Sequence, residues 1–239
     1  MINIAISFAI GLFVFYLTSF MGFPFFLNII IAILLAVASF VICAKLILKK
    51  ITVILEASQK EISKNRMDKA ISLIKSGYKY KYYHPFISSQ LNSQIGQIYY
   101  CKRDIKNAES YLKKGISTEY LPQCMLGFIY SRKGEFEKMN KTFKTTLRTN
   151  SKESFVWSTY AYCLDRAGKR DDAIALLNKA QKKLPGDEKV KKNLRALQNN
   201  QRIKMKAYKD LWTLLMQEKI VVKQRIRNPS RMRFQRIMQ

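Results

Sequence analysis

The chain has 239 residues, of which 43 are Lys or Arg and 16 are Asp or Glu, so its formal net charge is +27. A hydrophobic share of 48% excludes a disordered chain. A single His excludes a multi-His metal site, and four scattered Cys argue against a Cys-rich zinc site. Residues 1–44 contain no charged side chain at all. This division of charge is unlike that of a soluble globular protein.

Two apolar runs fill the uncharged region, at about residues 4–20 and 27–48, and residues 21–26 separate them. Each run is close to the ~20 residues that a helix needs to cross a hydrocarbon core. Helices are the form expected there, because lipid cannot satisfy open backbone groups. We therefore predict that residues 1–50 form two transmembrane helices joined by a short turn. A secretory signal peptide followed by one span is the alternative, but no basic residue precedes the first run.

The flanking charges give the expected orientation. Lys45, Lys49 and Lys50 follow the second run, whereas the turn at 21–26 carries no charge. The positive-inside bias then places both termini in the cytoplasm. We expect a multi-pass protein of a bacterial-type inner membrane, with two spans and a cytoplasmic soluble part.

The soluble part contains an internal repeat. Residues 120–151 align with residues 154–185 at an offset of 34 positions, so that Gly134 matches Gly168 and Phe143 matches Leu177. This pattern resembles the tetratricopeptide repeat (TPR) family, a 34-residue helix–turn–helix unit. The last unit supplies every residue of the family pattern: Trp157, Ala161, Gly168, Ala173, Leu177, Ala180 and Pro185.

The resemblance extends over residues 51–187 in four units. Their expected boundaries are about 51–88, 89–119, 120–153 and 154–187. Arg103 replaces the turn glycine of the second unit, and the first helix of the first unit continues directly from the second span. The expected fold is all-α, with an N-terminal transmembrane helical hairpin followed by a TPR-like α-solenoid with C-terminal capping helices.

The region after the repeats is strongly basic. Residues 188–224 predict a capping helix, with a stripe of Val190, Leu194 and Leu197, and then a basic amphipathic helix. One face of the second helix carries Met205, Tyr208, Leu211, Trp212 and Leu215. Residues 225–239 are expected to form a basic, flexible tail.

No motif for catalysis stands out. His84 is the only His, and neither GxGxxG nor a Walker-type phosphate loop is present. We expect no enzymatic activity, no catalytic residue, no metal site and no cofactor. A binding protein is the better expectation.

The family resemblance implies a concave groove built from the first helix of each unit. By register, the groove should be lined by Gln97, Tyr100, Phe128, Arg132, Phe155, Tyr162 and Arg166. Exposed aromatic rings beside arginines suit an extended or helical peptide that carries apolar and acidic groups. The predicted function is a membrane-anchored TPR-type scaffold or adaptor that binds a partner protein at the cytoplasmic face of the membrane.

The alternative function is a membrane-tethered protein that contacts RNA or a ribosome through its basic C-terminal extension. Contact with an anionic surface, either lipid or RNA, is predicted for Arg225, Arg227, Arg231, Arg233, Arg236 and Trp212. A third expectation competes with both, in which the face that carries Trp212 packs on the repeats instead.

Overall fold

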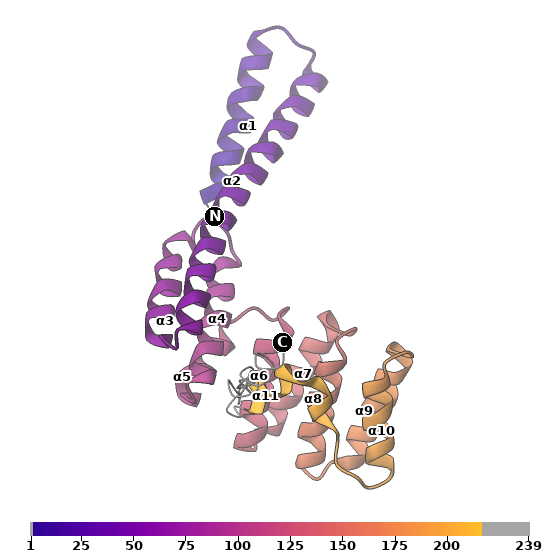
Figure 1. The fold of residues 1–239 in the computed structure, drawn as a ribbon. Helices are drawn as coiled ribbons and strands as arrows, with labels where there is room; N and C mark the ends of the chain where they lie inside the picture. Colours follow the sequence, from indigo (N-terminus) through magenta and orange to yellow (C-terminus); the bar gives the residue numbers. More distant parts are fainter. Residues whose placement is uncertain (1, 217–239) are drawn as a thin grey trace, which may run out of the picture.

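The computed structural model describes residues 2–216, and within that range it contains helices and no strand. A long pair of helices, α1 and α2, projects from a row of shorter helices (Figure 1). The all-α prediction is therefore confirmed for the described residues.

The two N-terminal helices form an antiparallel hairpin. Helix α1 spans Ile2–Phe20, and α2 spans Phe25–Ser63. Both are long and apolar enough to cross a membrane. Only 17% and 11% of the residues in their most apolar stretches are buried, unlike the residues of a helix in a soluble core. We call α1 together with residues 25–48 of α2 the apolar hairpin.

Four polar residues of the apolar hairpin lie on the inside. Asn3, Ser7, Thr18 and Asn28 are buried, while most of the large apolar side chains point outward. The Asn28 amide Nδ2 donates to Ser19 Oγ at 3.2 Å and to the carbonyl of Phe23 at 3.1 Å, which ties the turn to both helices.

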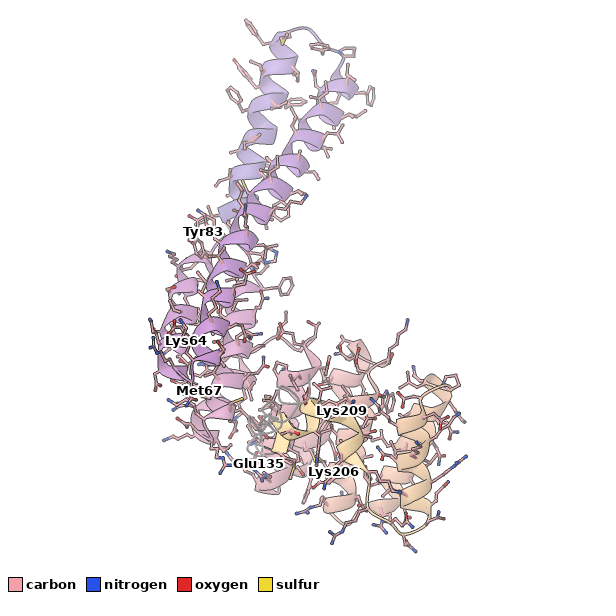
Figure 2. The ribbon with its side chains drawn as sticks, in the orientation of Figure 1. Lys64, Met67, Tyr83, Glu135, Lys206 and Lys209 are labelled. Carbon is pink, nitrogen blue, oxygen red and sulfur yellow. The ribbon has the colours of Figure 1, made fainter. Side chains whose placement is uncertain are left out.

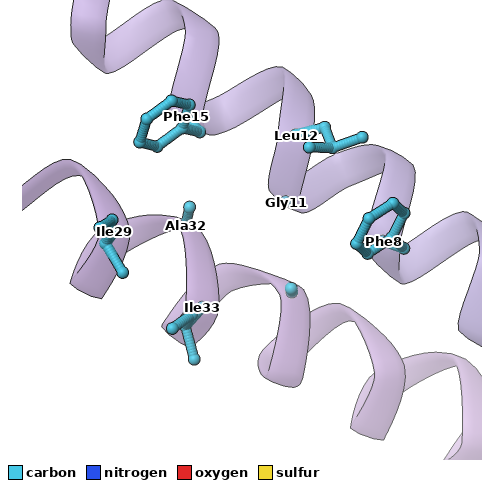
Figure 3. Close-up of a pocket in the computed structure, with 8 residues that line it drawn as sticks. Phe8, Gly11, Leu12, Phe15, Ile29, Ala32 and Ile33 are labelled. Atoms are coloured by element: carbon cyan, nitrogen blue, oxygen red, sulfur yellow. The ribbon is translucent and has the colours of Figure 1, made fainter.

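Small residues bring the two helices close together in the middle of the apolar hairpin. A Cβ added at Gly11 would lie 3.1 Å from the Cβ of Ala36. Beside this contact, Gly11, Phe15 and Ala32 help to line an open hollow of about 230 Å³ whose walls are apolar (Figure 3).

Helix α2 does not end at the edge of its apolar stretch. Its 39 residues extend for about 58 Å, and the second half forms the first helix of the repeat region. The predicted boundary between residues 50 and 51 falls inside this one helix. The apolar hairpin and the first repeat unit are thus joined by continuous helix, without a linker.

The following helices form consecutive pairs. The second half of α2 packs on α3 (Met67–Ser76), which leads through the 3₁₀ helix η1 (Gly77–Tyr80) to the next pair. The further pairs are α4 (Ile87–Cys101) with α5 (Ile105–Lys113), α6 (Tyr120–Lys133) with α7 (Phe136–Thr149), and α8 (Ser154–Arg166) with α9 (Arg170–Lys183).

One register recurs in all four pairs. A small residue in the first helix is followed seven positions later by a turn residue with positive φ, and sixteen positions later by a large buried residue. The small residues are Ser58, Gly96, Gly127 and Ala161; the turn residues are Asn65, Arg103, Gly134 and Gly168; the large residues are Ile74, Leu112, Phe143 and Leu177.

The small residues are required by close contact between the helices of a pair. A Cβ added at Gly127 would lie 2.6 Å from the ring of Phe143, and one at Gly96 would lie 2.7 Å from Leu112. Real side chains do not approach this closely, so a larger residue at either position would force the pair apart.

The apolar core consists of two clusters. One cluster joins α2, α3 and α4, and the other extends from α4 to α11. Tyr99 packs against both, so the first unit is connected to the remaining units through α4.

Helix α10 (Glu188–Gln198) follows the last pair and packs against α8 and α9. The predicted stripe of Val190, Leu194 and Leu197 is buried. Asn200, with φ of 55°, then reverses the chain.

The predicted amphipathic helix after α10 is wrong as a single element. The chain instead forms the 3₁₀ helix η2 (Met205–Tyr208) and the short α11 (Asp210–Met216), separated at Lys209 with φ of 46°. The reason is geometric, because this break lets Tyr208 and Trp212 both reach the inner side of the repeats. We call residues 201–216 the C-terminal segment.

Candidate partner-binding site

The predicted groove lies on the side of the repeats that carries α4, α6 and α8. Helix α6 packs beside both α4 and α8, and the C-terminal segment contacts α6 and α8. In Figure 1 the segment, coloured yellow, lies across these helices. The groove is therefore occupied along its centre by the protein's own chain.

Tyrosine hydroxyls fix the C-terminal segment in place. The hydroxyl of Tyr100 on α4 donates to the carbonyl of Leu215 at 2.5 Å. The hydroxyl of Tyr208 lies 2.8 Å from Ser158 Oγ and donates to the carbonyl of Ser154 at 3.1 Å. Burial raises the pKa of Tyr100 and of Tyr208, so both are neutral hydrogen-bond donors at physiological pH.

A buried asparagine connects α10 to the same network. The amide Nδ2 of Asn193 donates to Ser158 Oγ at 3.1 Å, and the amide Oδ1 accepts from the backbone N–H of Lys204 at 3.0 Å. Because a buried amide is costly unless it is hydrogen-bonded, these contacts specify the path of the chain after α10.

Trp212 fills the space between α6 and α8. Its ring lies 4.8 Å from the ring of Tyr162 and 6.4 Å from the ring of Phe128, centroid to centroid, both in edge-to-face geometry. Only 7% of its surface is exposed. This placement corrects the expectation that Trp212 contacts an anionic surface, because the indole is already buried in the protein.

Six of the seven predicted groove residues differ in how far the structure buries them. Tyr100, Phe128 and Phe155 are buried, since the C-terminal segment covers them. Tyr162 is half-buried, and Arg132 and Arg166 are exposed. The prediction of an open groove is therefore wrong at its centre.

Gln97 lies apart from the other predicted residues. It lines a separate hollow of about 190 Å³ with Gln59 and Ile98 on one side and Leu214 on the other. The structure does not bring Gln97 together with the two arginines.

The open part of the groove is a cleft beside the end of α11. It has a volume of about 290 Å³ and is lined by Phe128, Ser131, Arg132, Phe136, Tyr162, Arg166, Ala167 and Met216. We call it the arginine cleft. Sequence reasoning missed Phe136, which opens α7 and is 36% exposed.

Both arginines of the cleft are free to bind an anion. Neither Arg132 nor Arg166 forms an ion pair with a carboxylate in the described part of the chain. The Arg132 guanidinium lies 5.3 Å from the centre of the Phe128 ring, a distance at which the ring faces attract a cation. Elsewhere, Arg170 pairs with Asp165 at 2.8 Å.

Aromatic walls and two guanidinium groups define what the cleft can recognise. Guanidinium groups bind carboxylates with two parallel hydrogen bonds, and the rings supply apolar contact. The arrangement suits a side chain or chain end that carries a carboxylate beside an apolar group.

The remaining chemistry-bearing residues are not grouped. Within residues 2–216, no cluster of three or more His, Cys, Asp or Glu could hold a metal ion. Cys124 and Cys163 are buried, and burial raises the pKa of both thiols, so neither is a ready nucleophile. His84 lies beside the ring of Phe86.

Arg225, Arg227, Arg231, Arg233 and Arg236 lie outside the described residues, so their predicted contact with lipid or RNA stays a prediction. Comparison with protein families finds no family that matches this chain, and comparison with curated proteins finds no significant relative.

Proposed function

We propose that this protein is a membrane-anchored adaptor whose TPR-like repeats hold a partner protein at the cytoplasmic face of a bacterial-type inner membrane. The arginine cleft carries the proposal, because it combines an exposed aromatic ring with two arginines that have no carboxylate partner among residues 2–216. The partner contributes an acidic residue next to an apolar one.

The recurring register supports the TPR-like part of the proposal. A small residue, a left-handed turn residue and a large apolar residue recur at fixed spacing in four helix pairs. This is the arrangement that lets neighbouring pairs stack and bury a continuous core. Helix α10 then acts as the cap of the stack.

The distribution of polar and apolar residues in the apolar hairpin supports the proposed membrane anchoring. Its outer surface is apolar, whereas its buried residues include Asn3 and Asn28. Polar residues of membrane helices face one another because lipid offers them no hydrogen bonds. Lys45, Lys49 and Lys50 at the base favour the cytoplasmic orientation of the repeats.

Photo-crosslinking tests the site. A photoreactive phenylalanine analogue replaces Phe136 in the full chain, and membranes are irradiated with and without nuclease. We expect nuclease-resistant crosslinks to an acidic segment of a protein, and loss of these crosslinks in Arg132→Glu/Arg166→Glu.

Arg148→Glu/Arg195→Glu is the matched control, because it reverses two exposed arginines outside the cleft. Crosslinks that persist in Arg132→Glu/Arg166→Glu would contradict the proposed site. Crosslinks that disappear with nuclease would instead favour the RNA-contacting alternative.

A further inference from the structure

The segment between the first two repeat units lies at the base of the apolar hairpin. We call residues 77–86, GYKYKYYHPF, the aromatic collar. The backbone N–H of Ile2, at the start of α1, donates to the carbonyl of Tyr82 at 2.9 Å. In Figure 2 the label of Tyr83 marks this junction. The aromatic collar thus sits at the level where the apolar surface of the hairpin ends.

The inner side of the aromatic collar is fixed to the repeats. Tyr78, Tyr80 and Tyr83 pack against the core of α2, α3 and α4. The hydroxyl of Tyr78 donates to Asn92 Oδ1 on α4 at 2.5 Å. These contacts hold the segment in a defined shape, although it contains only a short 3₁₀ helix.

The outer side exposes aromatic rings. After Val53, the large hydrophobic side chains that are exposed in the described chain are Tyr82, Phe86 and Phe136. Two of these three therefore belong to the aromatic collar, with 57% and 59% of their surfaces exposed. Rings at this density on one short segment need a reason, since no other part of the described repeats shows it.

Lysines lie beside two rings of the aromatic collar, the exposed Tyr82 and the half-buried Tyr80. Lys81 Nζ lies 4.7 Å from the centre of the Tyr82 ring, and Lys79 and Lys50 lie 5.2 Å and 6.0 Å from the centre of the Tyr80 ring. Lys45 and Lys49 are exposed on the same stretch of α2.

No described carboxylate neutralises this group of lysines. None of the five forms an ion pair within residues 2–216. The first acidic residue of the chain is Glu56, which lies further along α2, away from the apolar hairpin. The outer side is consequently cationic as well as aromatic.

We propose that the outer side of the aromatic collar binds the phosphate headgroups of anionic phospholipids and so holds the first repeat unit against the bilayer. The inference rests on the membrane anchoring of the proposed function. Aromatic rings prefer the depth of the headgroups, and lysines near an anionic leaflet are attracted to it. The collar thereby fixes the orientation of the repeats relative to the membrane.

Native mass spectrometry of the full chain in a mild detergent tests the proposal. The probes are phosphatidylglycerol, which is anionic, and phosphatidylcholine, which has no net charge. We expect phosphatidylglycerol to bind more tightly. We expect Lys79→Gln/Lys81→Gln to weaken its binding by about fivefold per lysine removed, or about 25-fold for the pair.

The matched control is Lys182→Gln/Lys183→Gln, which removes two exposed lysines from the end of α9. Its affinity for phosphatidylglycerol should stay within twofold of the wild type. An equal loss in both variants would overturn the proposal, because the effect would then come from net charge alone. Equal binding of the two lipids would overturn it as well.

A second variant reports position directly. In Tyr82→Trp, reconstituted into vesicles, the introduced indole should add fluorescence that lipids brominated near the headgroup quench. Alkaline extraction of the same vesicles distinguishes loss of membrane anchoring from loss of headgroup contact by the aromatic collar. If the chain is extracted, the membrane anchoring itself fails. If the chain stays integral and the introduced indole is quenched only by aqueous iodide, the collar proposal alone is overturned.

Discussion

The apolar hairpin and the repeats place the same kinds of residue on opposite sides. In the hairpin, Phe8, Phe13 and Phe26 are each more than 60% exposed, whereas in the repeats Phe143 is fully buried. Polar residues show the opposite distribution. Asn28 is buried inside the apolar hairpin, whereas most lysines of the repeats are exposed. Figure 2 shows this as carbon-rich side chains around the hairpin and nitrogen-tipped ones around the repeats.

These opposite patterns suit different surroundings, water for the repeats and, under the proposed membrane anchoring, lipid for the apolar hairpin. Burial of apolar groups stabilises the repeats because water surrounds them. The apolar hairpin would expose a contiguous apolar surface to water, which soluble proteins avoid. Among residues 54–216, large hydrophobic side chains are exposed in the aromatic collar and in the arginine cleft, the two sites that we propose for lipid and for a partner.

The largest expected effect is a cavity in the repeats. Phe143→Ala should lower the free energy of unfolding by about 3–5 kcal/mol, since the ring is fully buried and stacks on Tyr160 at 4.9 Å. Phe13→Ala, which truncates a ring that is 66% exposed, should leave unfolding of the repeats unchanged. Urea unfolding of the full chain in detergent, followed by circular dichroism, measures both. Equal losses of unfolding free energy in the two variants would contradict the contrast between the apolar hairpin and the repeats.

A smaller effect should follow from overfilling the contact between α8 and α9. Ala173 is fully buried, so Ala173→Leu should cost roughly 1–3 kcal/mol of unfolding free energy. Ala175 lies two residues further along α9 and is exposed, so Ala175→Leu should change the value by less than about 0.5 kcal/mol. The same urea titration compares them, and a neutral Ala173→Leu would show that the register of the pair is wrong.

Docking of the C-terminal segment should depend on the Tyr208 hydroxyl. Tyr208→Phe removes the hydroxyl contacts with Ser158 and Ser154 and should lower the free energy of unfolding by about 1 kcal/mol. Trp212 should then become more accessible to acrylamide. Tyr16→Phe, in the apolar hairpin and 74% exposed, is the control and should leave the quenching of Trp212 unchanged.

The last effect is seen only at alkaline pH. Burial, followed by the charge of Tyr111, raises the pKa of Tyr78 from 10.0 to about 12. Because the pKa is higher in the folded state, the stability contributed by neutral Tyr78 is complete below pH 10 and is lost as pH rises to about 12. Thermal unfolding of Tyr78→Phe between about pH 9 and pH 12 should show a shallower decline than the wild type. An identical decline would mean that Tyr78 does not titrate in this way.

Much of the fold could be predicted from local patterns. The apolar runs predicted α1 and the first half of α2, and the spacing from Ala161 to Leu177 predicted the contact between α8 and α9. The first pair was harder, because Ser58 and Asn65 take the places of the small residue and the turn glycine. Both substitutions are physically acceptable, since Ser is small and Asn tolerates positive φ, but neither is a strong signal.

The occupied groove could not be predicted in the same way. The hydrogen bond from Tyr100 to Leu215 joins residues 115 positions apart, and no periodicity links them. The stripe from Met205 to Leu215 correctly indicated a buried face, but the break at Lys209 depends on the shape of the groove that receives it. Only tertiary packing decides whether such a face meets lipid, RNA or protein.

Membrane topology tests whether the apolar hairpin crosses the membrane and leaves the repeats in the cytoplasm. Paired reporters, one active only in the cytoplasm and one only outside the inner membrane, are fused to the end of the full chain and, separately, inserted at Gly22 in the turn. We expect cytoplasmic activity at the chain end and external activity at Gly22. External activity at the chain end, or cytoplasmic activity at both positions, would contradict it.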